Sequence, residues 1–184
     1  MRRRTFDTLM SIAGLLIAVV LVVAGGLLTW GHNYITDEVH DQLAAQKIFF
    51  PPADSPAVAG PEFVEMRKYG GQQLLTGAQA RVYADDFIAV HLKESGGGLT
   101  YSELSAKSMA NPTDTELAAQ VETQFRGETL RGLLLNAYAF GTMGQIAGIA
   151  AIAAFVGGGV MLILSGLGLY HSRKTPPDAE ILVD

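Results

Sequence analysis

The pattern of hydrophobic and polar positions is dominated by two long stretches that contain no Asp, Glu, Lys or Arg. The first covers 8–36 (29 residues) and the second covers 132–172 (41 residues). A transmembrane helix needs about 20 consecutive apolar residues, so each stretch is long enough to cross a bilayer. The pattern predicts an all-α membrane protein, in which two transmembrane helices flank a small helical extracytoplasmic module.

The second stretch is too long for one span, because 41 helical residues at about 1.5 Å each would reach twice the roughly 30 Å of bilayer hydrocarbon. We therefore divide it into a helix that leads in to the membrane and the span itself. The expected segments are a tail (1–8), a first transmembrane helix (9–30), the module (31–131), a membrane-proximal lead-in helix (132–145), a second transmembrane helix (146–170) and a tail (171–184).

The basic residues next to the spans predict the orientation. Arg2, Arg3 and Arg4 precede the first span, and Arg173 and Lys174 follow the second. Short tails rich in Lys and Arg stay on the cytoplasmic side of a membrane. We expect a multi-pass protein of the cell membrane with both termini cytoplasmic and 31–131 extracytoplasmic.

A cleaved signal peptide is the alternative interpretation of the N-terminal stretch. Its three arginines resemble the positively charged start of such a peptide. However, the apolar run 9–30 is longer than the roughly 7–15 residues of a typical signal-peptide core. We therefore expect this segment to remain as an anchor.

Small residues are dense in the second span, with spacings that let helices approach closely. Gly144 and Gly148 are four apart, and so are Ala150, Ala154 and Gly158. This spacing favours tight helix packing, and Gly14, Ala18, Gly25 and Gly26 are expected to supply the facing surface in the first span. The alternative is that Gly and Ala are simply common in bacterial spans. Neither span carries an ionisable residue in its interior, which argues against a proton relay or an ion pathway.

Two capping boxes predict helix starts within the module. Thr76 with Gln79, and Thr100 with Glu103, have the residue types and the spacing of this motif. The expected helices run from 34 to 46, from 78 to 92, from 100 to 109, and from the Thr113–Glu116 segment past Gly127 towards the second span, separated by a proline-rich loop at 49–61 and a glycine linker at 96–98.

Charge and composition exclude several functions. The segment from Asp37 to Arg131 holds 14 acidic and 8 basic residues, which gives no reason to expect nucleic acid as a partner. The chain has no cysteine, which excludes disulfides, thiolate metal sites and a cysteine nucleophile.

Candidate catalytic chemistry is sparse. His32, Asp37 and His40 are the densest group of potential metal ligands, but the two histidines are eight residues apart and form no known ligand motif. Asp85 and Asp86 are consecutive, so on an α-helix they would point about 100° apart and are expected on a solvated face. We predict no catalytic residue, no metal site and no cofactor.

The segment from Arg126 to Arg131 is the most distinctive polar patch. One interpretation is a docking surface for a partner subunit or lipid headgroups. The other is a solvated helix face with ion pairs worth about a few tenths of a kcal/mol each. The candidate residues for packing against partners or lipids are Arg126, Glu128, Arg131, Asn136, Tyr138, Gly144, Gly148, Ala154 and Gly158.

Three runs in the second half of the chain resemble a known family. They are Thr100–Glu103, Ala110–Pro112 and Phe125–Tyr138. They resemble small two-span membrane proteins of actinobacteria, and the resemblance covers most of the chain. Members are often labelled as aromatic ring-opening dioxygenases. The family is also similar to a factor associated with the mycobacterial respiratory supercomplex of cytochrome bcc and cytochrome aa3 oxidase.

The two parts of this resemblance imply different functions. A dioxygenase needs metal ligands such as two histidines and a carboxylate, which this sequence does not offer at a convincing spacing. The similarity to the supercomplex-associated factor implies a cofactor-free accessory subunit that packs against cytochrome oxidase or cytochrome bcc subunits. We expect a non-catalytic accessory or structural subunit of a larger membrane complex. The alternative is a membrane-anchored metal-dependent enzyme with an outer-face site around His32, Asp37 and His40.

Overall fold

We describe the fold from a computed structural model, which covers residues 2–176 and Ala179. Within these residues all named elements are helical, and extended pairing is limited to one bridge between Phe49 and Gln73. Two helices, α1 (Arg3–Gln46) and α6 (Thr115–Lys174), are long and apolar enough to cross a membrane. The chain divides into two units. The first is Met1–Tyr34 with Gly144–Asp184, and the second is Ile35–Met143.

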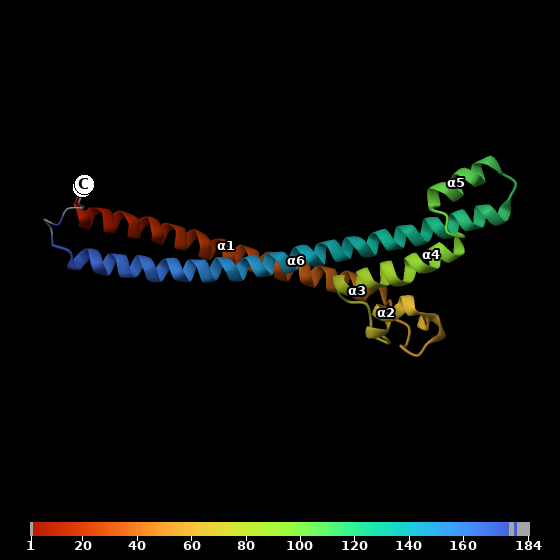
Figure 1. The fold of residues 1–184 in the computed structure, drawn as a ribbon, viewed down its shortest axis with the longest axis horizontal. Coiled ribbons are helices and arrows are strands. Elements are labelled where there is room, and N and C mark those ends of the chain that lie inside the picture. Colours follow the sequence, from red (N-terminus) through yellow and green to blue (C-terminus); the bar gives the residue numbers. More distant parts are fainter. Residues whose placement is uncertain (1, 177–178, 180–184) are drawn as a thin grey trace. The chain divides into compact units, whose positions relative to one another are not determined.

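In the first unit, the N-terminal part of α1 and the C-terminal part of α6 lie side by side (Figure 1). Apart from Gly14, the buried positions of both helices in this unit are small residues that recur every seven positions. They are Ser11, Ala18 and Gly25 in α1, and Gly144, Ala151, Gly158, Ser165 and Ser172 in α6. A seven-residue repeat corresponds to 3.5 residues per turn, as in helices that wind around each other with a left-handed twist. We call these eight residues the small-residue seam.

Side chains at the seam are small because the helices are close. A Cβ atom added at Gly158 would lie 3.2 Å from Cγ2 of Val22, and one at Gly25 would lie 3.0 Å from the Phe155 ring. The outward faces instead carry large aliphatic side chains. Val20 and Ile149, for example, are 66% and 70% exposed. Small residues inside and bulky aliphatic residues outside are the arrangement expected of helices surrounded by lipid.

The second unit contains the end of α1, four short helices and the first part of α6. The short helices are α2 (Val64–Lys68), α3 (Gly77–Val82), α4 (Ala89–Ser95) and α5 (Tyr101–Ala110), with a π-helix (Tyr83–Ile88) between α3 and α4 and 3-10 turns at Pro56–Val58 and Pro61–Phe63. Its buried core consists of Val39, Leu43, Phe50, Val58, Phe63, Met66, Leu74, Ala80, Ala84, Ile88, Leu92 and Leu134. The core therefore joins both long helices to the short ones.

Both predicted capping boxes are confirmed. The Thr76 hydroxyl accepts a hydrogen bond from the Gln79 backbone, and the Gln79 side chain accepts one from the Thr76 backbone. Thr100 and Glu103 make the same reciprocal pair at the start of α5. Two of the four N–H groups that a helix start leaves unpaired are thus satisfied locally, which explains why the sequence alone locates these starts.

Helix α6 begins within the Thr113–Glu116 segment that was expected to open it. The cap is Asp114, whose Oδ1 accepts from the Leu117 backbone N–H at 2.9 Å, and the helix begins at Thr115. From there α6 continues without a break through Gly127 and through the predicted lead-in and span. Residues 132–143 of the lead-in belong to the second unit. The predicted tail 171–184 lies partly outside the described residues.

The predicted helix 78–92 is helical throughout, but its middle is a π-helix, Tyr83–Ile88. A π-helix bonds each carbonyl to the fifth residue ahead and not the fourth, so the side chains it carries shift around the axis. Asp85 and Asp86 lie within this π-helix.

Candidate functional site

In the second unit, α6 has an inward face that packs on the short helices. Leu134 is buried in the core, and Arg131 donates from Nη2 to Oδ1 of Asp85 at 3.0 Å. The Arg81 guanidinium lies 5.4 Å from the centroid of the Tyr138 ring, close enough for a cation–π interaction. Of the predicted packing residues, Arg131 and Tyr138 therefore make contacts inside the module.

The remainder of the predicted polar patch is exposed. The Arg126 side chain is 77% exposed, and its Nε donates to Glu122 one turn earlier at 2.7 Å. Glu128 accepts from Nη1 of Arg131 at 3.4 Å. Exposed pairs of this kind contribute little to stability. The patch thus separates into Arg131, which connects elements, and Arg126, which lies on a solvated face.

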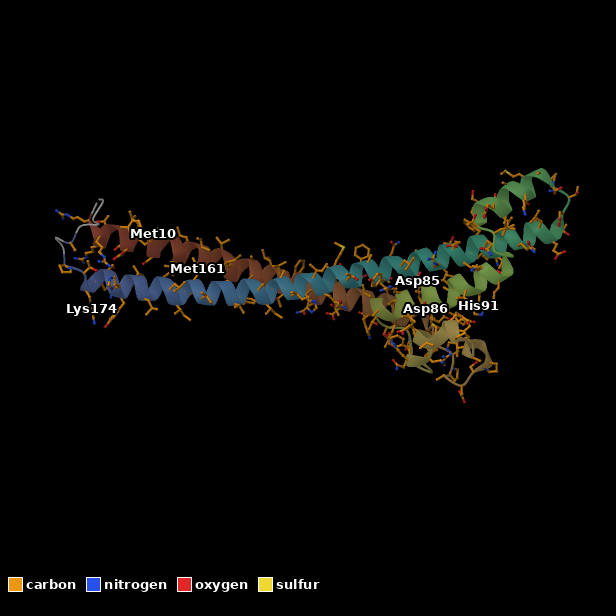
Figure 2. All side chains as sticks on the ribbon, viewed as in Figure 1. Met10, Asp85, Asp86, His91, Met161 and Lys174 are labelled. Atoms are coloured by element: carbon orange, nitrogen blue, oxygen red, sulfur yellow. The ribbon has the colours of Figure 1, made fainter. Side chains whose placement is uncertain are left out.

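Asp85 and Asp86, which are labelled in Figure 2, line one cleft of about 330 Å³, together with Glu65, Tyr69, Ala78, Arg81, Val82 and Tyr138. Burial raises the pKa of Asp86, and the carboxylates of Asp85 and Glu65 raise it further. Hydrogen bonding to Asp85 raises the pKa of Arg131. The expectation of a solvated face was incomplete, because both aspartates are half-buried and line this cleft. Arg81, 3.9 Å from Asp85, already supplies the cleft with a cation.

Glycines bring the short helices against α6. A Cβ atom at Gly77 would lie 2.9 Å from the Ala137 carbonyl oxygen, and one at Gly127 would overlap the side chain of Leu92. From the sequence, the helix was expected to continue past Gly127, and no packing role was assigned to this glycine. The available signal was its position inside an otherwise strong helical pattern, where glycine costs about 1 kcal/mol and needs a packing reason.

The glycines predicted to pack in the second span contact α1. The His32 Nδ1–H group donates to the Gly144 carbonyl at 2.7 Å, and a Cβ atom at Gly148 would lie 3.0 Å from the same imidazole. Gly158 lies against α1 at Val22, whereas Ala154 is half-buried. The first unit therefore uses most of these predicted packing positions within the chain.

The outward face of α6 in the second unit is apolar and exposed. Leu133, Phe140 and Met143 are 58%, 56% and 57% exposed, and Asn136 is exposed between them. Their spacing of three, four and three places them on one helix face. We call Leu133, Asn136, Phe140 and Met143 the α6 stripe. Of these, only Asn136 is among the packing candidates given from the sequence, because exposure of the others depends on which face the module covers.

The potential metal ligands do not form a cluster in the described part of the chain. No group of three or more His, Asp or Glu residues there converges as a metal site would require. His32 belongs to the first unit and donates to a backbone carbonyl, while His40 belongs to the second unit and lies 3.1 Å from Asp41.

The fold defines an all-helical protein with two helices able to cross a membrane. Comparison with known proteins finds no matching family model, no similar curated protein and no similar solved structure. The resemblance to the actinobacterial family therefore rests on the sequence motifs given above.

Proposed function

We propose that this protein is a non-catalytic accessory or structural subunit of a larger integral membrane complex. In this proposal α1 and α6 anchor it in the cell membrane, both termini are cytoplasmic, and the module is extracytoplasmic. The resemblance suggests the actinobacterial respiratory supercomplex as the complex, with cytochrome oxidase or cytochrome bcc subunits as partners.

The α6 stripe is the observation that carries this proposal. Its three large apolar side chains are more than half exposed, although they belong to the unit that carries most of the charge of the chain. Exposed apolar patches on such a surface are typical of interaction sites. Phe and Met are enriched at protein interfaces, and the Asn136 amide at the centre can hydrogen-bond to a partner.

The small-residue seam also favours the α6 stripe as the main surface for a partner. Because the seam residues are covered within the chain, they are not free to bind another subunit. Open glycines on the outer surface of α6, such as Gly159 and Gly166, have no atom within 4 Å of an added Cβ. The partner contact is therefore expected mainly at the α6 stripe, with the lipid-facing side of the spans as a secondary contact.

The test is copurification from membranes after mild detergent extraction, with mass spectrometry of the associated proteins. The unmodified protein is expected to bring down larger integral membrane subunits in fixed ratio. Replacing Leu133 and Phe140 together by Ser should lower this recovery about tenfold or more, because interfaces depend on a few apolar anchors.

Met109→Ser is the matched control. Met109 is 74% exposed on α5, away from the α6 stripe, so its replacement should leave recovery unchanged. Recovery of the unmodified protein as a free monomer would contradict the proposal, as would equal losses in the two variants. If respiratory subunits are absent but other membrane subunits are present, the supercomplex assignment fails and the accessory role remains.

A further inference from the structure

A groove runs along one side of the helix pair in the first unit. It has a volume of about 530 Å³ and is lined by Thr29 and His32 of α1 and by Gln145, Gly148, Ile149, Ala151, Ile152 and Phe155 of α6. Gly148 and Ala151 are the small residues of this lining, and the other α6 residues carry larger side chains. The Phe155 ring lies against Gly25 of α1.

Polarity changes along this groove. Along α6 the lining changes from the polar Gln145 to the apolar Ile149, Ile152 and Phe155, and on α1 His32 lies at the Gln145 end, where it bonds to the Gly144 carbonyl. Ten residues separate Gln145 from Phe155, which corresponds to about 15 Å along a helix. The groove therefore matches an elongated ligand that has one polar end.

The polar end lies at the level where aromatic residues mark the membrane surface. Trp30 and Tyr34 flank His32 in sequence, are 68% and 57% exposed, and stack with ring centroids 5.8 Å apart. Exposed Trp and Tyr rings favour the headgroup region of a bilayer. The apolar end then extends into the hydrocarbon, where an acyl chain would lie.

The polar groups indicate which part of a lipid is recognised. Thr29 donates its hydroxyl proton to the Gly25 carbonyl and His32 donates from Nδ1 to the Gly144 carbonyl. The exposed Gln145 carboxamide remains as the donor that can reach a ligand. The groove lining includes no Lys or Arg, the residues that recognise phosphate through charge. Ester carbonyls, which are uncharged acceptors, fit this donor.

We propose that this groove binds one glycerolipid through its ester region, with the Gln145 amide donating to an ester carbonyl and one acyl chain lying over Gly148 and Ala151. This inference rests on the membrane insertion proposed above, but not on the partner complex. It assigns to the first unit a lipid that remains with the protein when the surrounding bilayer is removed.

Native mass spectrometry of the purified protein in detergent, titrated with dioleoylglycerol or dioleoyl phosphatidylglycerol, tests the proposal. Both lipids are expected to give a one-to-one adduct with similar affinity, because they share the ester region and chains. Gln145→Leu should weaken both adducts about fivefold through loss of a hydrogen bond. Ile149→Ala should weaken both about threefold through loss of wall contacts.

Ile163→Ala is the matched control, since Ile163 is 65% exposed on the same helix but does not line the groove. It should leave both adducts unchanged. Binding of the phosphate-bearing lipid alone, absence of an adduct, or equal effects of Ile149→Ala and Ile163→Ala would overturn the proposal. A cross-linked polypeptide in the groove would also overturn it.

Alkaline carbonate extraction of the unmodified protein and of each variant distinguishes failure of the lipid-site proposal from failure of the proposed function. A protein that stays in the membrane pellet but forms no adduct contradicts the lipid site alone. A protein that is released by carbonate contradicts membrane insertion, on which both proposals depend.

Discussion

At the scale of single residues, the three consecutive glycines of α6 have unequal roles. A Cβ atom would lie 3.2 Å from the Val22 side chain at Gly158 and 3.5 Å from Leu21 at Gly157, but would meet no atom within 4 Å at Gly159. Three consecutive helical residues cover most of a turn, so the run itself does not indicate which glycine faces α1. The seven-residue repeat of the small-residue seam shows that it is Gly158.

Gly158→Leu is therefore expected to destabilise the helix pair by about 1–3 kcal/mol, because the new side chain forces the backbones apart. Gly159→Leu should be neutral or slightly stabilising, since it fills open space and improves helix propensity. Reversible unfolding in mixed detergent micelles measures both. Similar destabilisation by the two substitutions would show that the seam is not the contact between the spans.

At the scale of elements, local chemistry could be predicted and longer-range packing could not. The capping boxes were predictable because their donors and acceptors are three residues apart. The π-helix at Tyr83–Ile88 has no such local signal, since an α-helical pattern of apolar residues also fits this segment. The shared cleft of Asp85 and Asp86 was not predicted either, because it is completed by residues distant in sequence, such as Glu65 and Tyr138.

The two capping boxes differ in their expected response to pH. Hydrogen bonds from the backbone and side chain of Thr100 lower the pKa of Glu103. A lowered folded pKa stabilises the start of α5 above the ordinary carboxyl pKa, and this contribution is lost as pH falls through the lowered value. Hydrogen exchange corrected for intrinsic rates should show the first turn of α5 losing protection between about pH 6 and pH 3.

The box of Thr76 and Gln79 is the internal control, because an amide does not titrate in this range. Its protection at the start of α3 should remain constant, and Glu103→Gln should make α5 behave in the same way. Equal acid loosening of α3 and α5 would instead indicate a global effect on the module.

At the scale of the whole molecule, the charge-free stretches predicted two long helices, and the structure has helices of this kind at α1 and α6. The candidate surfaces were predicted less well. Gly144, Gly148 and Gly158 could be recognised as packing residues, and the small residues Gly14, Ala18 and Gly25 of the first span as the surface that faces them. The apolar members of the α6 stripe were not among the packing candidates, because a sequence does not show which face of α6 the short helices cover.

Orientation in the membrane is directly testable because the chain contains no cysteine. Ser102→Cys, in the module, should react with a membrane-impermeant maleimide in intact cells. Thr5→Cys, beside the N-terminal arginines, should react only after permeabilisation, since those arginines hold the tail in the cytoplasm. The opposite labelling pattern would reverse the proposed topology.

The small-residue seam also has a consequence for biogenesis. A span whose glycines are reserved for another subunit is incomplete when it leaves the insertion machinery, and cellular quality control recognises such unassembled proteins. Here the two spans complete each other, so we expect newly made protein to persist as a finished hairpin before it meets a partner. Joining and leaving a complex would then require no unfolding within the bilayer, as suits a component added late in assembly.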